Sequence, residues 1–350
     1  MIGKSLRYYR MLSGKTQDAL AEDVGISKMA ISYYEAEKRT PSPDILEKLC
    51  SALNISVSKL LDYQDGPVSI NIENIGEIHG AFRKKTSLSP SKQEFILACV
   101  EQEVNKYLAA AEFAGVVLES TLAKIVVQGS NATETAENIR DTLGIPKNGP
   151  IANLTQAMED ADILVIMVEI PTDNQESVGD FSGFCFWSSN GLSVVAVNSA
   201  LSVEQQRFAL AHELVHLLVT GANENGEDWI DDIARHFLLT SGDIRKELGF
   251  KRKALGRQDI EYIQTKYGVS ASTVITRASQ EHIISDAVGA RASQIRFSPI
   301  FNKESPTRLR QMVCRAYYEG EIGIGKVAEM LRVSIVEARD MCGVGVSAEW

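Results

Sequence analysis

Apolar residues recur at intervals of three and four along most of the chain, which is the spacing of amphipathic helices. This pattern predicts helices over 16–24, 27–35, 89–117 and 136–143, and another that the segment 149–154 opens and that ends near Asp160. Short β-rich apolar runs follow and predict strands over 163–168, 183–187 and 192–197. A strongly apolar helix is then expected over 203–220, with further helical patterning over 241–285 and 307–342. The predicted fold is mainly α with a small β-sheet, an α+β fold.

The first sixty residues contain two short predicted helices joined by a tight turn. Thr16 is an N-cap candidate for the first helix, because its hydroxyl can accept from a free backbone N–H. Gly25 can adopt the positive φ that ends the helix, and Ser27 can cap the next one. Two short helices with a glycine in the turn form the helix-turn-helix plan, in which the second helix enters the major groove of DNA.

This segment resembles the phage-repressor (Xre) type of DNA-binding domain over about residues 3–62. The resemblance rests on the pattern of residues at Arg10, Thr16-Gln17, Leu20-Ala21, Gly25-Ile26-Ser27, Ile31-Ser32, Glu35 and Pro41. Glu37 departs from it, because the family usually has glycine there. The resemblance implies binding to operator DNA, usually as a homodimer on a palindrome. The residues that would face DNA are Gln17, Ser27, Lys28, Met29, Ser32 and Tyr33. The alternative is a helical module used for protein contacts.

Charge and cysteine content change this picture only modestly. The formal net charge is −10, but residues 1–60 carry nine basic and seven acidic residues, so this segment is mildly basic and the remainder acidic. A protein that coats nucleic acid along its whole length would not have this balance. The five scattered cysteines, without a Cys-x-x-Cys pair, favour reduced thiols and argue against a cysteine zinc site. With no signal peptide or apolar span, we expect a cytoplasmic protein without a membrane partner.

The most informative segment is the helix predicted over 203–220, which contains a His-Glu-x-x-His motif. His212 and His216 are four residues apart and therefore lie on one helix face, where both imidazoles can reach one Zn²⁺. Glu213 would lie beside the metal, where it can act as the general base of a metallopeptidase. The alternative is two hydrogen-bonded histidines in a buried helix. Such polar groups are costly in an apolar helix unless they have partners, which favours a metal site.

Residues around this motif resemble the ImmA/IrrE family of metallopeptidases, over roughly residues 80–345. The resemblance rests on Gly149-Pro150-Ile151, Asn153-Leu154, Asn198, Arg207-Phe208, Ala211 to His216, and Ile233-Ala234 with Leu238-Leu239. It implies a zinc peptidase that cleaves a repressor or partner protein, and an Xre domain fused ahead of the peptidase is a recurrent arrangement. Other members accompany toxins as antitoxin components.

The third zinc ligand is the point at which the sequence departs from this family. The resemblance implies a glutamate four residues before the family's Phe-Ala pair, and Trp229 occupies that position. Nearby candidates are Glu227, Asp228, Asp231, Asp232 and His236. At about 100° per residue, Asp232 lies about 60° from the Trp229 direction and His236 about 20°. We expect Asp232 as the ligand, with Asp228 and His236 as alternatives.

Together these observations predict a DNA-binding domain over 1–63, a linker over 64–80, a zincin domain over 81–285 and a C-terminal helical region over 286–350 that packs on it. The expected function is a DNA-binding regulator whose zinc peptidase domain cleaves a repressor or partner. The alternative is a DNA-binding antitoxin with a non-proteolytic zincin domain that neutralises a toxin by binding it, which the tryptophan at the ligand position favours.

Overall fold

The computed structural model describes residues 2–57, 60, 90–120, 122, 131–169, 181–188, 191–222, 226–295, 297, 301 and 303–343. The linker predicted over 64–80 lies outside these residues. The described chain is mainly helical with one three-stranded sheet, which confirms the α+β prediction. Among the described helices none is both long and apolar enough to cross a membrane.

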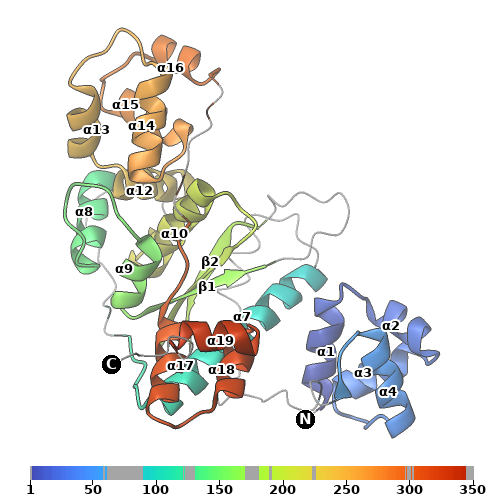
Figure 1. The fold of residues 1–350 in the computed structure, drawn as a ribbon. Coiled ribbons are helices and arrows are strands. Elements are labelled where there is room, and N and C mark those ends of the chain that lie inside the picture. Colours follow the sequence, from blue (N-terminus) through green and yellow to red (C-terminus); the bar gives the residue numbers. More distant parts are fainter. Residues whose placement is uncertain are drawn as a thin grey trace.

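The N-terminal helices form a small bundle of their own (Figure 1, blue). They are α1 (Ile2–Leu12), α2 (Gln17–Val24), α3 (Lys28–Glu35) and α4 (Pro43–Ala52). Thr16 and Ser27 cap α2 and α3 as expected, each accepting from a backbone N–H three residues on. Gly25 ends α2 at φ 74° and ψ 36°, a left-handed conformation that glycine adopts without steric cost. Leu6, Leu20, Ile31 and Leu49 are fully buried at the centre of the bundle.

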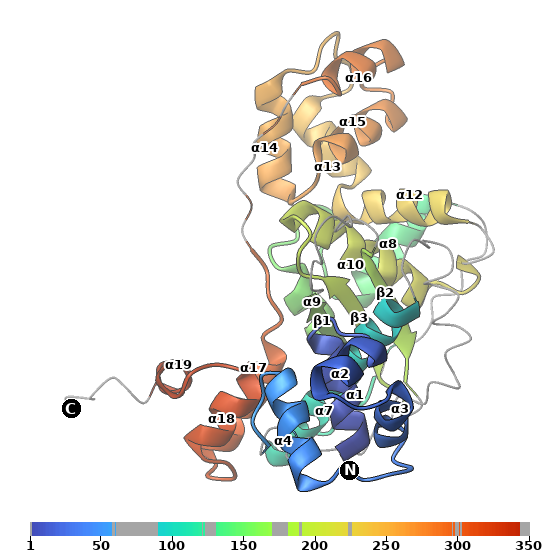
Figure 2. The same ribbon diagram turned by 90° about the vertical axis from the view of Figure 1, so that its right-hand side faces the viewer.

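A long helix, α7 (Pro90–Phe113), connects this bundle to the rest of the molecule (Figures 1 and 2). Ala98 and Cys99 pack against the core of the N-terminal bundle. Further along the same helix, Val104 and Tyr107 belong to the core beneath the sheet. One helix therefore supports both the N-terminal domain and the body.

The sheet has the order β1-β3-β2 and consists of β1 (Ile163–Val168), β2 (Gly183–Trp187) and β3 (Ser193–Asn198). β1 pairs with β3 in parallel and β2 pairs with β3 antiparallel. The strands are apolar on both faces because helices cover both faces. Alternate residues divide between the two sides: Val165 and Val195 face one core, whereas Leu164 and Val194 face the other.

The two faces of the sheet carry different groups of helices. On one face, α9 (Leu154–Asp160) and α10 (Val203–Leu218) pack against the strands, and α12 (Glu227–Leu238) and α8 (Ala132–Thr142) complete the same core behind α10. The other face packs against α7 and the C-terminal helices α17 (Arg308–Tyr318), α18 (Ile324–Leu331) and α19 (Ile335–Met341). The remaining helices extend beyond α12 (Figure 1, top) and are α13 (Ser241–Leu248), α14 (Arg257–Tyr267), α15 (Ala271–Gln280) and α16 (Asp286–Ala292).

A buried ion pair ties the C-terminal part of this body to α9 and α10. The Arg207 guanidinium on α10 pairs with Glu304. Glu304 also accepts hydrogen bonds from the backbone N–H groups of Leu154 and Thr155, the first residues of α9. The carboxylate thus satisfies the free donors of a helix N-terminus and neutralises a buried cation at once.

Candidate metal centre and nucleic-acid interface

Helix α10 presents two histidines whose ring nitrogens converge. The Nε2 atoms of His212 and His216 lie 3.1 Å apart, and the two rings meet edge to face with centroids 4.9 Å apart. His212 is 4% exposed, so its ring is buried in the body of the protein. Two adjacent imidazole nitrogens on consecutive helical turns are the arrangement expected for two ligands of one metal ion.

Glu227, the first residue of α12, supplies a third donor atom. Its Oε2 lies 3.1 Å from His212 Nε2 and 3.6 Å from His216 Nε2. Ligands at about 2.0–2.1 Å from a tetrahedral Zn²⁺ lie about 3.3–3.4 Å from one another. The three separations here, 3.1, 3.1 and 3.6 Å, bracket that value. Within the described part of the chain, these three residues form a group that could hold a metal ion.

Glu227 reaches this position because of the turn that precedes α12. Gly226 has φ 87°, a conformation that a side chain would strain, and it directs the chain into the helix at Glu227. The sequence-based choice assumed that the ligand lies further along the helix, near the direction of Trp229. The first acidic residue after a glycine at the helix start is the signal that would have identified Glu227.

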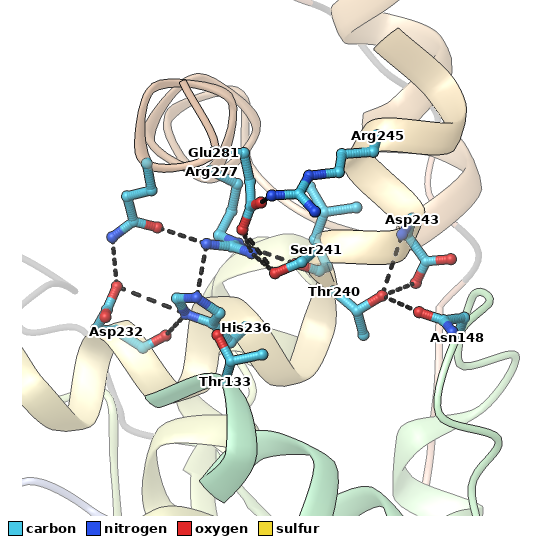
Figure 3. Close-up of polar contacts among 12 residues, drawn as sticks. Thr133, Asn148, Asp232, His236, Thr240, Ser241, Asp243, Arg245, Arg277 and Glu281 are labelled. Atoms are coloured by element: carbon cyan, nitrogen blue, oxygen red, sulfur yellow. Dashed lines mark hydrogen bonds and ion pairs between the residues drawn. The ribbon is translucent and has the colours of Figure 1, made fainter. Parts of the chain in front are cut away.

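The structure places Asp232, the expected ligand, away from the two histidines. Its carboxylate accepts a hydrogen bond from Gln280, and its backbone oxygen lies 2.8 Å from His236 Nδ1 (Figure 3). On the helix, Asp232 lies five residues after Glu227 and so faces α15 rather than α10. Asp228, another expected candidate, is exposed in the first turn of α12. Neither the Asp232 nor the Asp228 carboxylate is part of the group formed by His212, His216 and Glu227.

His236, the remaining candidate, belongs to a buried polar junction between α12 and α15. The guanidinium of Arg277, which is fully buried, lies 2.8 Å from His236 Nε2 and also donates to Leu239 O and Glu281 (Figure 3). Because guanidinium can only donate, His236 Nε2 must be the unprotonated acceptor. Burial, and then the charge of Arg277, lower the pKa of His236. A neutral histidine that joins two helices is the role that this geometry supports.

Asp231 lies behind His212 rather than beside the metal position. Its Oδ1 is 2.8 Å from His212 Nδ1, and its Oδ2 accepts from Arg235 at 3.0 Å. A carboxylate accepts only, so it favours the tautomer with hydrogen on Nδ1 and leaves Nε2 free to bind a cation. Arg235 also lies over the ring of Phe208, which packs against His212. Sequence reasoning had placed Asp231 among possible ligands and had missed this orienting position.

Glu213 lies against the sheet, where a glycine makes room for it. The side chain is buried, and a Cβ atom built at Gly183 on β2 would lie 3.1 Å from Glu213 Cγ and 2.8 Å from the backbone oxygen of Ala196. Gly183 therefore permits the close approach of α10 to β2.

The three converging side chains also fit zinc by their chemistry. His212, His216 and Glu227 offer two imidazoles and one carboxylate, which is the ligand composition of many catalytic zinc sites.

The expected DNA-facing residues fall into two groups. Met29 is 62% exposed and Tyr33 is 39% exposed, both on the outer face of α3. Lys28 is also exposed, and its Nζ lies 2.6 Å from Asp18 Oδ2. Gln17 and Ser27 make contacts within the bundle instead: Gln17 Nε2 donates to Glu35 Oε2 at 2.8 Å, and the Ser27 hydroxyl caps α3. Ser32 is half-buried on the same helix.

Glu35 is held in turn by a second buried residue of the bundle. The guanidinium of Arg10 binds the carboxylate of Glu35 with two hydrogen bonds, Nε to Oε1 and Nη2 to Oε2. This two-pronged pair links α1 to α3 and fixes the orientation of the outer face of α3.

Comparison with known proteins finds a family match in two segments of the chain. Residues 6–60 match the helix-turn-helix family. The transcriptional regulator SinR of Bacillus subtilis is 40% identical over 63 residues, which cover 18% of this chain and 57% of SinR. The uncharacterized HTH-type transcriptional regulator YazB of the same organism is 36% identical over 58 residues, covering 17% of this chain and 84% of YazB. The chain belongs to the HTH-type transcriptional regulators.

One segment of the body of this regulator matches a second family. Residues 175–279 match the IrrE N-terminal-like domain of the M78 peptidases, a range that includes α10, α12 and all three converging side chains. The recognition of an Xre-type domain fused to an ImmA/IrrE-type domain is confirmed. The chain spans a little over half the length of SinR, and the shared part is confined to the helix-turn-helix domain.

Among its described residues, the regulator contains two more helix pairs with the same turn as α2 and α3. Gly268 and Arg332 both adopt a left-handed conformation, and each is followed by valine and then by a serine that caps the next helix. The second helix of the first pair, α15, is largely covered, since Thr273, Val274 and Arg277 are buried. In the last pair, α19 exposes Ile335 and Val336 where α3 exposes Lys28 and Met29. Of the three, α3 has the surface best suited to DNA.

Proposed function

We propose that this regulator binds operator DNA through α3 and hydrolyses a peptide bond in a repressor or partner protein at a zinc site in its IrrE-like domain. The observation that carries the peptidase part is the convergence of His212, His216 and Glu227. Their ligand atoms lie 3.1–3.6 Å apart, as a tetrahedral metal requires. In this proposal Glu227 replaces Asp232 as the third ligand.

The residues around this site have separable roles. A bound Zn²⁺ would polarise the scissile carbonyl and increase the acidity of water. Glu213 follows the first ligand on α10, and its carboxylate would accept a proton from the attacking water and donate it to the leaving amine. Asp231 would hold the His212 ring in the ligating tautomer. The Glu227 side chain is 38% exposed, so a peptide could approach the site from that side.

The DNA-binding part of the proposal rests on the exposed face of α3. Lys28, Met29 and Tyr33 project from a helix that Arg10 and Glu35 fix to the rest of the bundle. Lysine can reach guanine or phosphate, and the apolar groups can contact thymine methyls. We expect the protein to bind a palindromic site as a homodimer, since this places one helix in each half-site.

The non-proteolytic alternative, in which the protein neutralises a toxin by contact, drew its support from Trp229 at the family's glutamate position. That support weakens because Glu227 brings a carboxylate to the histidines from two residues earlier in the chain. If the proteolysis experiment below fails, neutralisation of a toxin by direct contact becomes the favoured function.

Proteolysis is tested by comparing two strains, one with the native protein and one with Glu213→Gln. Glutamine leaves the three ligands in place but cannot act as a base. Labelling of protein N-termini in both strains should reveal one or a few new termini that depend on Glu213. If both proteins bind zinc and neither strain shows such a terminus under any growth condition in which the protein is made, the peptidase proposal fails.

A further inference from the structure

Two cysteines from different helices are in contact within the C-terminal unit. The Sγ atoms of Cys314, on α17, and Cys342, which ends α19, lie 3.4 Å apart. Both thiols are free, Cys342 is 2% exposed and Cys314 is half-buried. An S–S bond is about 2.05 Å long, so the sulfurs would need to approach by about 1.4 Å.

A second contact holds the backbone of Cys342 in place. The hydroxyl of Tyr318 donates to the backbone oxygen of Cys342 at 2.6 Å. Tyr318 lies one helical turn after Cys314, so one face of α17 contacts both the side chain and the backbone of Cys342. Reacting groups held in this way gain the rate advantage of an intramolecular reaction.

We propose that Cys314 and Cys342 are an oxidisable dithiol that a hydroperoxide converts to an intramolecular disulfide. The half-buried Cys314 is the thiol that the oxidant reaches: its thiolate attacks the peroxide oxygen, forming a sulfenic acid and releasing hydroxide from hydrogen peroxide. The Cys342 sulfur then attacks the sulfenic sulfur, the S–S bond forms, and water leaves. Two thiols lose two electrons, and one peroxide is reduced to two waters.

The surroundings of Cys314 make this reaction slow at neutral pH. Burial and then the hydrogen bond with Cys342 raise the pKa of Cys314 to about 11, while Arg310 lowers it slightly. Tyr318, whose hydroxyl donates to the backbone oxygen of Cys342, is a further titratable group beside the pair. Because the thiolate is the nucleophile, the rate should increase with pH up to that range. The pair therefore suits sustained oxidation rather than a rapid response.

The bond would close a ring that contains the end of α17, all of α18 and all of α19. Arg332, in the turn between these helices, pairs with Glu103 on α7 at 3.0 Å. α7 also carries Ala98 and Cys99, which pack against the N-terminal bundle. Oxidation would thus restrict the motion of α18 and α19, which contact α7 through Arg332, and α7 in turn packs against the DNA-binding domain.

The experiment is a thiol map of the full-length zinc-loaded protein after exposure to hydrogen peroxide. Remaining thiols are blocked with iodoacetamide and the protein is digested with trypsin without reduction. Cleavage after Arg310, Arg315 and Arg339 isolates Cys314 in residues 311–315 and Cys342 in residues 340–350. We expect the disulfide-linked pair of these two peptides, formed within a monomer and lost on reduction.

Two variants serve as matched controls. Cys314→Ser should abolish the linked peptides, and Cys185→Ser, which removes a half-buried cysteine on β2, should leave them unchanged. The proposal is overturned if Cys314 and Cys342 remain alkylated after Cys185 or Cys99 has been oxidised, or if Cys314 links to another chain. The native protein alone decides between these results, so an unstable variant does not prevent the test.

Discussion

Asp231 and His212 form a carboxylate–imidazole pair in which Asp231 Oδ1 lies 2.8 Å from His212 Nδ1. The aspartate comes from α12 and the histidine from α10, so the pair joins the two helices that supply the three candidate ligands. Arg235, one turn further along α12, holds the other carboxylate oxygen. Asp231 therefore fixes the orientation of the His212 ring through a contact that does not require a bound metal.

Asp231→Ala should weaken zinc binding by about 10- to 100-fold, because the His212 ring loses the group that fixes its tautomer and orientation. Competition with a chromophoric chelator measures the affinity directly. Asp231→Asn keeps an acceptor oxygen and should recover part of the loss. An affinity for zinc in the alanine variant equal to that of the native protein would exclude this role.

Replacement of Met29 and Tyr33 by alanine should weaken specific DNA binding about tenfold, because loss of recognition at one base pair typically costs about 1–3 kcal/mol. The probe is DNA selected from a random pool by the native protein, and binding is followed by fluorescence anisotropy. Tyr262→Ala is the matched control, because Tyr262 is 55% exposed on α14, outside the N-terminal bundle. Equal losses in the two variants would remove α3 as the reading helix.

Glu37→Gly should stabilise the N-terminal bundle by up to about 1 kcal/mol. Glu37 follows α3 with φ 56°, the left-handed region in which side chains cost about 1–2 kcal/mol and glycine costs none. Part of the gain is lost because glycine has more freedom in the unfolded chain. Hydrogen exchange of the buried amides of Leu20 and Ile31 reports the change, and Lys38→Gly, at an ordinary φ, should give no gain.

Stability of the α12–α15 junction should fall as the pH drops below about 6.5, the ordinary pKa of histidine. Burial and Arg277 lower the pKa of His236, so the unfolded chain binds a proton at a pH where the folded chain does not. Asp232 and Glu281 act in the opposite direction but do not reverse the shift. Hydrogen exchange of α15 at pH 5 and 7 should show the loss in the native protein and a smaller loss in His236→Gln.

Local sequence patterns predicted most of the elements that build this fold. Thr16 and Ser27 cap helices where their hydroxyls indicated, and the strand predicted over 163–168 has the observed bounds. The strand order was not predictable, because β3 lies between β1 and β2 only through pairing between distant segments. Glu37 shows the reverse case: the family's glycine marks a left-handed position, and here a glutamate occupies it.

The candidate site was predictable only for residues on one helix. His212, Glu213 and His216 have fixed relative positions because the helix period sets them. Glu227 depends on the turn at Gly226 and on how α12 packs against α10, neither of which follows from spacing alone. Gln17 illustrates the same limit, since its side chain binds Glu35 on the next helix.

Zinc stoichiometry of three purified proteins tests the central claim most directly. Elemental analysis is made after incubation with zinc and removal of the excess, on the native chain, Glu227→Gln and Asp232→Asn. We predict about one zinc per chain in the native protein and in Asp232→Asn, and little in Glu227→Gln. Zinc retained in Glu227→Gln but lost in Asp232→Asn, or absent from the native chain, would contradict the proposed site.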